Sequence, residues 1–272
     1  MEIKAADVAK LRKMTGAGMM DCKAALIESN GDYEKAKDII REKGKLVADK
    51  RADRTATEGV VVTKIVGTKG YMLCLACETD FVAKNAEFGA SADEILAIAV
   101  KNDVADLDAL MATKEGAASV ADMVTDKSGQ TGEKVELPFY ARVEAPFVDA
   151  YVHTNRKLGS MVGFNKEVPA EVAHDVCMQA TAMAPVSISE KDVPAAVLEK
   201  EREIGREQAR QEGKPEAMLD KIAEGKLAKF IKENTLLNQA LVKDPKITVG
   251  QFIKNADKDA EVVAYKRFSL ND

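Results

Sequence analysis

Two stretches of the sequence decide the fold: VVVTKIVGTKGYMLCLACE, Val60–Glu78, and DAYVHTNRKLGSMVGFNKE, Asp149–Glu167. In each, apolar residues alternate on both sides of a short polar turn, a pattern typical of a β-hairpin. The second stretch overlays the first without gaps, and Gly70 then falls on Gly159. The two copies are 89 residues apart. This separation is longer than the period of a solenoid repeat, so we expect two related subdomains.

A helix is predicted after each hairpin. SADEILAIAV, residues 91–100, follows the first, and PAEVAHDVCMQATAMA, residues 169–184, follows the second. The last segment, VVAYKRFSL at 262–270, alternates well enough to close the second subdomain as a strand. We therefore predict an α+β fold whose two related α+β subdomains have antiparallel sheets and share one layered core.

Three short helices are predicted in residues 1–44. The first is ended by TGAG at 15–18, where two glycines permit backbone angles that other residues resist. Asp32 can cap the third helix, which we expect to end at Gly44. Three helices of this size bury little apolar surface, so we expect a unit that is marginal alone and serves recognition.

A charge-rich helical hairpin is predicted beyond the second repeat. Its two helical stretches are separated by Gly213-Lys214-Pro215, which suits a glycine after one helix and a proline in the first turn of the next. Apolar residues at helical spacing predict its seam: Val197, Ile204, Met218 and Ile222.

These patterns divide the chain into five parts. Residues 45–57 are basic and poor in apolar residues, which is typical of a linker or a solvated helix. The expected units are the three-helix domain 1–44, the linker 45–57, the first core subdomain 58–137, the second core subdomain 138–192 with 237–272, and the inserted hairpin 193–236.

Composition narrows the class of protein. The chain has 272 residues and a net charge of −5, which favours solubility and gives no general affinity for nucleic-acid phosphates. The N-terminus has no signal-peptide pattern, and no apolar run approaches the roughly 20 residues of a membrane span. No glycine-rich phosphate-binding motif is present. We expect a cytoplasmic protein that binds neither nucleotide, nucleic acid nor membrane.

The pair Cys74-x-x-Cys77 is the most tempting chemical motif. Both cysteines lie in a stretch with strand periodicity, where residues three apart point to opposite faces of a sheet. No second pair and no histidine stand at ligand spacing, so we expect buried thiols and neither a metal site nor a cofactor. Of the two histidines, His174 is expected on the surface of a helix, whereas His153 lies near the second hairpin turn, where the first copy has Lys64.

Two other features suit contact with a partner. Met19 and Met20 are adjacent, so a helix cannot bury both on one face, and an exposed methionine is an adaptable apolar contact. Asp80-Phe81 stand where a strand ends. On pattern alone, Phe81 either folds back into the core with Asp80 as a helix cap, or is exposed for binding.

Three motifs together resemble the bacterial elongation factor Ts family. They are LRKMTGAGMMDCKAAL at 11–26, ETDFVAKN at 78–85, and GKLAKF with LLNQ between 225 and 239. The resemblance runs in order over essentially the whole chain. It implies an N-terminal domain similar to ubiquitin-associated domains, two related core subdomains, and a helical hairpin protruding from the second. It also implies a guanine nucleotide exchange factor for the GTPase elongation factor Tu.

The resemblance assigns roles to particular residues. Four would disturb the Mg²⁺ site of the GTPase: Asp80, Phe81, Val82 and Ala83. Five more would contact it elsewhere: Met19, Met20, Lys23, Thr79 and His153. Many members continue with a further helix that touches the GTPase, whereas this sequence stops at Asp272, so affinity is expected to depend more on the other contacts.

Two alternative functions compete with nucleotide exchange. A binding module, such as an adaptor or chaperone related to ubiquitin-associated domains, would recruit a partner without altering its nucleotide. An oxidoreductase would use Cys74 and Cys77. The helical hairpin is also a candidate for dimer contacts. No nucleophile motif in the sequence points to covalent catalysis.

Overall fold

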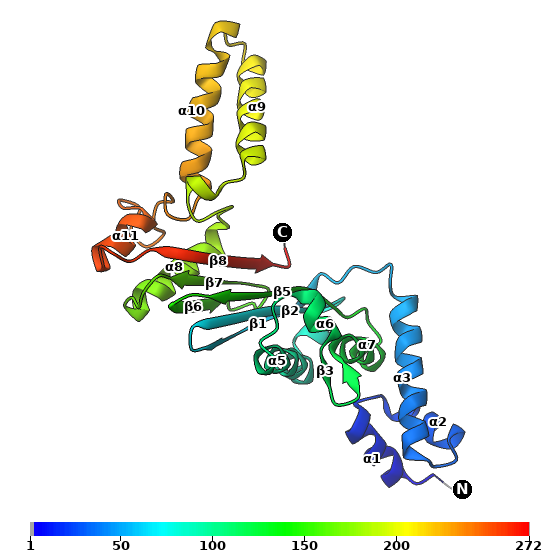
Figure 1. Cartoon of the computed structure of the whole chain (residues 1–272). Coiled ribbons are helices and arrows are strands. Elements are labelled where there is room, and N and C mark those ends of the chain that lie inside the picture. Colours follow the sequence, from blue (N-terminus) through cyan, green and yellow to red (C-terminus); the bar gives the residue numbers. More distant parts are fainter. Residues whose placement is uncertain (1–2, 272) are drawn as a thin grey trace.

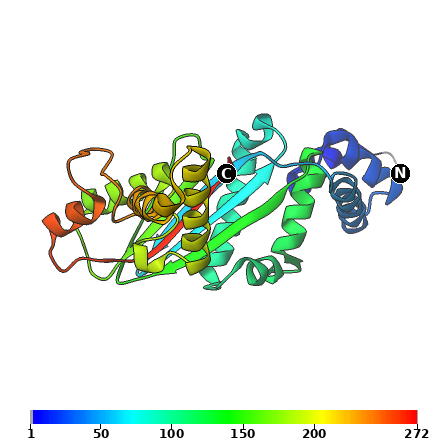
Figure 2. The same cartoon turned by 90° about the horizontal axis from the view of Figure 1, so that it is seen from above.

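The computed structural model describes residues 3–271, so residues 1, 2 and 272 of the predicted outer units lie outside it. The molecule is elongated, with the N-terminal helices at one end and α11 (Val249–Ala256) at the other (Figure 2). Between them lie two three-stranded antiparallel sheets with helices on their outer faces (Figure 1). The predicted α+β class is confirmed.

The three N-terminal helices are confirmed. They are α1 (Ala5–Thr15), α2 (Met19–Glu28) and α3 (Tyr33–Lys50). Gly16 ends α1 in the left-handed region, with φ of 69°. Asp32 caps α3, as predicted, because its carboxylate accepts hydrogen bonds from the backbone N–H groups of Glu34 and Lys35. The unit has its own small core, separate from the cores of the sheets.

The predicted end of the third helix at Gly44 is wrong. Helix α3 continues through Gly44 to Lys50, which shortens the expected linker. Gly44 is needed there for packing, because α3 crosses α7 (Val120–Thr131) at a contact between Gly44 and Gly129. A Cβ on Gly129 would lie 2.4 Å from the Gly44 Cα atom. The two glycines therefore let the helix backbones touch and fasten the N-terminal unit to the core.

The first sheet has the order β1-β2-β5. Its strands are β1 (Glu58–Val66), β2 (Lys69–Cys77) and β5 (Glu136–Glu144). The first predicted hairpin is confirmed, with Val66 pairing with Lys69. The predicted subdomain boundary at residue 137 is wrong for the sheet, because it falls inside β5, whose Leu137 and Tyr140 enter the first core.

Helices α5 to α7 cover the outer face of the first sheet (Figure 1). After β2 the chain forms α4 (Asp80–Ala83), α5 (Ala86–Lys101), α6 (Leu107–Ala112), β3 (Lys114–Glu115), β4 (Ala118–Ser119) and α7. The predicted helix at 91–100 is confirmed and begins one turn earlier, at a cap formed by Asn85. Helix α7 is thus covered by α3 on one side and packs on the sheet with the other.

The second sheet has the order β6-β7-β8 and confirms the predicted closing strand. Its strands are β6 (Phe147–Val152), β7 (Leu158–Phe164) and β8 (Val262–Ser269). The helices of this subdomain are α8 (Ala170–Met183), the 3₁₀ helix η1 (Glu190–Asp192) and α11. Helices α8 and α11 pack with this sheet in one apolar core.

The internal repeat holds for β2 and β7 but fails in the turns. Gly70 pairs with Ile65, five positions before it in the chain. Gly159 pairs with Val152, seven positions before it. The second turn is longer, so the expected match of His153 with Lys64 is wrong. The two sheets face each other across a third apolar core. Gly70 and Gly159 both lie at this interface, where a Cβ on Gly70 would come within 2.8 Å of Val148.

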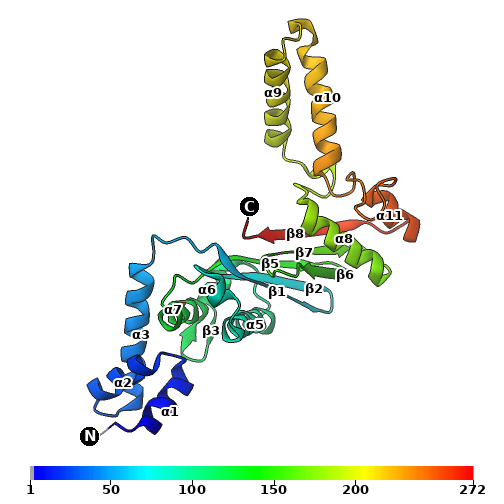
Figure 3. The ribbon, with the colours of Figure 1, turned by 180° about the vertical axis from the view of Figure 1, so that it is seen from behind.

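The helical hairpin consists of α9 (Ala195–Gln211) and α10 (Glu216–Asn234) and projects from the second sheet (Figure 3). The predicted seam is wrong at Ile204 and Met218, which are exposed, whereas Val197 and Ile222 are half-buried. The buried seam residues are Gly205, Ala209, Leu219, Ala223 and Leu227. A Cβ on Gly205 would lie 3.3 Å from the Ala223 Cα atom, so small residues determine which faces meet.

Among residues 3–271, the helices are all too short or too polar to cross a bilayer.

The glycine contact between α3 and α7 predicts unequal effects of two alanine substitutions. Both Gly→Ala changes gain about 0.5–1 kcal/mol of helix propensity. Gly129→Ala should also cost about 1–3 kcal/mol of overpacking against backbone that cannot move aside. Gly44→Ala should cost less, because its Cβ would lie 3.6 Å from the nearest atom, an ordinary contact. We expect trypsin to cleave Gly129→Ala faster at Arg51 and Arg54, with Gly44→Ala no faster than the unmodified protein. Equal cleavage rates for the two variants would contradict this role of the contact.

Candidate functional site

Phe81 is the most exposed large apolar residue of the described chain. It lies on the four-residue helix α4, and its side chain is 86% exposed. The alternative in which Phe81 folds into the core with Asp80 as a helix cap is therefore wrong. Asn85 caps α5, accepting a hydrogen bond from the Glu87 N–H at 2.8 Å. Asp80 instead pairs with Lys84 at 2.6 Å, and this hydrogen bond lowers the pKa of the Asp80 carboxyl group.

The residues around Phe81 hold α4 against the protein. Val82 and Ala83 are partly buried and pack on the core of the first sheet. On the preceding side, the Cys77 thiol donates a hydrogen bond to the Thr79 carbonyl at 3.3 Å. The aromatic ring thus projects into solvent from a backbone segment that is fixed at both ends.

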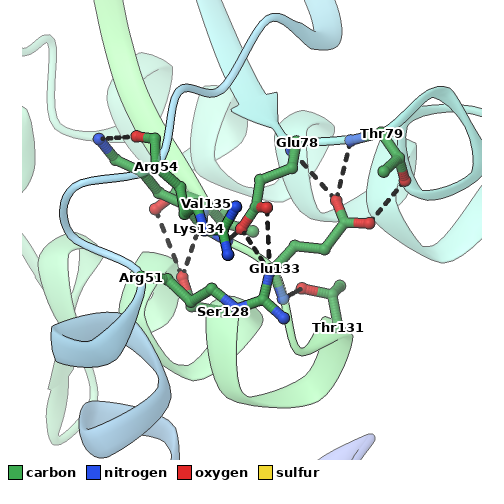
Figure 4. A network of polar contacts seen from close by, with 9 residues as sticks. All are labelled: Arg51, Arg54, Glu78, Thr79, Ser128, Thr131, Glu133, Lys134 and Val135. Atoms are coloured by element: carbon green, nitrogen blue, oxygen red, sulfur yellow. Dashed lines mark hydrogen bonds and ion pairs between the residues drawn. The ribbon is translucent and has the colours of Figure 1, made fainter.

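Two glutamates link the exit of β2 to the loop after α7 through hydrogen bonds (Figure 4). The Glu133 carboxylate accepts from the backbone N–H groups of Glu78 at 3.1 Å and Thr79 at 3.0 Å, and from the Thr79 hydroxyl at 2.5 Å. In return, the Glu78 carboxylate accepts from the Lys134 N–H at 2.6 Å. This bond, followed by the pairing with Arg51, lowers the pKa of Glu78. The segment before α4 is therefore tied to the loop between α7 and β5.

The same loop binds the end of α3. Arg51 donates to both carboxylate oxygens of Glu78, at 2.9 and 3.0 Å, and the Lys134 ammonium donates to the Arg54 carbonyl (Figure 4). The ammonium also donates to the Ala52 carbonyl. Sequence reasoning missed Glu133 and Lys134, which lie in a stretch that reads only as a subdomain boundary. No spacing or composition signal marks them, because their partners are distant in the sequence.

Met19, Met20 and Lys23 lie together on α2 and are accessible. The two methionine side chains are 44% and 74% exposed, and Lys23 is exposed as well. Met19 lines an open groove of about 620 Å³ together with residues between positions 9 and 16, from α1 and its end, and with Glu87 and Ala90 of α5. The groove therefore lies between the N-terminal unit, mainly α1, and the helices α5 and α7 of the core.

His153 is exposed in the longer turn of the second hairpin, with Nδ1 3.2 Å from the Tyr151 hydroxyl. This turn lies against β1, because the Val61 N–H donates to the Arg156 carbonyl at 2.7 Å and Lys157 pairs with Glu58. Glu58 pairs across the sheet with Cys77, three residues before α4. The structure thus brings the His153 turn and α4 to the same end of the first sheet.

The four cysteines are buried and unpaired. As predicted, Cys74 and Cys77 lie on opposite faces of β2, the former between the two sheets and the latter under the helices. Burial raises the pKa of Cys77 to about 12 and the pKa of Cys74 further. Within residues 3–271, no three His, Cys, Asp or Glu side chains are grouped to hold a metal ion.

Comparison with known proteins identifies the family. The sequence model described as Elongation factor TS matches residues 78–272, beginning at the glutamate before α4. Elongation factor Ts of Christiangramia forsetii is 46% identical, over 99% of both chains. The chain belongs to the elongation factor Ts family. It is a translation elongation factor, and its resemblance to that family is confirmed.

Other relatives cover the N-terminal helices as well. Elongation factor Ts of Porphyromonas gingivalis is 45% identical over 100% of this chain and 99% of its own. That of Cytophaga hutchinsonii is 46% identical over 99% of both. Similarity therefore extends over the three-helix unit, beyond the part that the family model matches.

The burial of the thiols predicts their reactivity. Because the thiolate is the reactive form, a thiol whose pKa is raised by burial is both unreachable and uncharged near neutral pH. We expect iodoacetamide at pH 8 to leave Cys74 and Cys77 unmodified in the folded protein and to alkylate all four cysteines in guanidinium chloride. Mass spectrometry of the peptides checks this. Rapid native labelling of either residue would argue against their structural role.

Proposed function

We propose that the protein is a guanine nucleotide exchange factor that binds elongation factor Tu with GDP and speeds the release of GDP. The observation that carries this proposal is the exposed Phe81 ring on a fixed four-residue helix, in a chain of the elongation factor Ts family. A solvent-exposed aromatic ring on a fixed segment offers a partner a large apolar area to bury.

The chemistry of Phe81 suits the displacement of packed elements in another protein. A Phe side chain gains about 1.5–3 kcal/mol when it moves from water into an apolar site. It has few rotatable bonds, so little conformational entropy opposes its insertion. We infer that Asp80, Phe81, Val82 and Ala83 enter the GTPase near its Mg²⁺ site.

Disturbing the Mg²⁺ site loosens GDP without a covalent step. In GTPases Mg²⁺ bridges phosphate oxygens and neutralises their charge, so moving the groups that position the metal weakens metal and nucleotide together. Coupling between two binding sites is reciprocal. Nucleotide therefore weakens binding of the exchange factor as much as the factor weakens binding of nucleotide, and incoming GTP can release it.

The remaining contacts hold the GTPase in place. We propose that Met19, Met20 and Lys23 dock a second face of it, and that Thr79 and His153 add contacts beside α4. The positions support this division, because the groove at Met19 and the His153 turn lie on different sides of the start of α5. Arg156 of that turn has Nη1 3.4 Å from a Cβ built on Gly89 of α5.

The proposal predicts the effect of removing the ring. Catalytic amounts of the protein should speed release of labelled GDP from elongation factor Tu, and Phe81→Ala should slow that release at least about tenfold, as for a buried interface anchor. The fold should be unaffected, since Phe81 contributes little to any core. Val242→Ala, which truncates another exposed apolar side chain, should exchange normally.

The same assay separates exchange from simple binding. An adaptor would bind elongation factor Tu and leave the rate of GDP release unchanged, and that result would overturn the proposal. If release is accelerated but Phe81→Ala is fully active, the protein is an exchange factor whose inserted element lies elsewhere.

A further inference from the structure

The orientation of the short helix α4 depends on its contacts with the rest of the protein. Helix α4 has four residues, and its only side-chain ion pair, between Asp80 and Lys84, is internal to the segment and exposed. Val82 and Ala83 fix one side by packing on the core. The direction in which Phe81 projects therefore depends on how the chain enters α4 at Glu78 and Thr79.

The Glu133 side chain binds both Glu78 and Thr79. Glu133 accepts three hydrogen bonds from these two residues, two from backbone N–H groups and one from a hydroxyl. Hydrogen bonds to a carboxylate are among the stronger ones in proteins, and bonds to backbone fix the chain itself rather than a rotamer. Glu133 thus determines the backbone geometry immediately before the inserted residues.

Glu133 is itself firmly placed. Gly132 ends α7 in the left-handed region, and the Glu133 N–H donates to the Thr131 hydroxyl at 3.3 Å. Two residues later, the Val135 N–H donates to the buried Ser128 hydroxyl at 3.0 Å (Figure 4). The loop that carries the carboxylate is therefore anchored to the same α7 that α3 packs on.

We propose that Glu133 is a positioning residue for nucleotide exchange, which orients Phe81 through its hydrogen bonds to Glu78 and Thr79. This inference rests on the proposed exchange function. Glu133 acts by geometry, so the positions of its two side-chain oxygens matter more than its charge. The link from Arg51 and Lys134 to the end of α3 holds the N-terminal unit to the same loop.

Two substitutions separate geometry from charge. Glu133→Gln removes the charge but keeps the length, and its amide can retain all three contacts, because its oxygen accepts from the N–H groups and the Thr79 hydroxyl can rotate to accept from its NH₂. Glu133→Asp keeps the charge but is one methylene too short to span these contacts. The matched controls are the same changes at Glu115, an exposed carboxylate paired with Lys101.

The experiment measures the GDP-release rate of elongation factor Tu against the concentration of each variant. We expect Glu133→Asp to lower the maximal rate by up to about tenfold, the loss expected on removing the Phe81 ring, because Glu133 acts through that ring. Glu133→Gln should stay within about threefold of the unmodified protein, and both Glu115 variants should match it. The half-saturating concentration should change little, because docking through α2 is intact.

A merely structural role gives a different result. Partial unfolding lowers the amount of active protein, so it shifts the half-saturating concentration but leaves the maximal rate at saturation unchanged. That result, or a larger loss in Glu133→Gln than in Glu133→Asp, would overturn the inference. Circular dichroism confirms that each variant is folded.

A double variant tests whether Glu133 acts through Phe81. If it does, Glu133→Asp with Phe81→Ala should be no slower than Phe81→Ala alone, whereas independent effects would multiply. Multiplied losses would overturn the inference. Failure of the unmodified protein to speed release would overturn the exchange function itself, which is a distinguishable result.

Discussion

The close approach of the two sheets is the constraint on which the arrangement of the molecule depends. A Cβ on Gly163 would lie 2.7 Å from that of Ala145, and one on Gly159 would lie 3.3 Å from Val61. Because these positions have no side chain, the sheets pack face to face at short distance. The long turn of the second hairpin then reaches β1 and hydrogen-bonds to it through Arg156. Surface residues far apart in sequence are thereby brought to one end of the core.

Helix α7 connects the core to the N-terminal unit. It packs on the first sheet, contacts α3 through the two glycines, and ends in the loop that holds Glu78 and Thr79. Its Gln130 also donates to the Thr15 carbonyl at 2.6 Å, beside the start of α2. One rigid helix therefore fixes the separation between the methionines of α2 and the aromatic ring of α4. A three-helix unit with so small a core depends on this support.

Periodicity predicted the elements well, and packing between elements limited the rest. The alternation of apolar residues around the two turns predicted both hairpins. Strand geometry predicted that Cys74 and Cys77 lie on opposite faces of the sheet. The end of α3 and the seam of the helical hairpin were missed for one reason. At Gly44 and Gly205, glycine serves close contact between helices, whereas its usual meaning in a sequence is a helix end or a weak position. The site residues on α4 came from a family motif, and Glu133 came only from the structure.

The two copies of the repeat differ in the residues that follow β2 and β7. After β7 the positions equivalent to 79–81 are Val168, Pro169 and Ala170, and the chain turns inward there, with Val168 buried in the second core. In the first copy the equivalent position is Thr79, whose polar groups bond to Glu133 and keep the segment at the surface. The position of Thr79 thus holds a buried apolar residue in the second copy, whereas the position of Phe81 is exposed in both copies. Exposure at this position is therefore common to both copies, and the first copy adds the aromatic ring and the Glu133 carboxylate that binds the chain just before it.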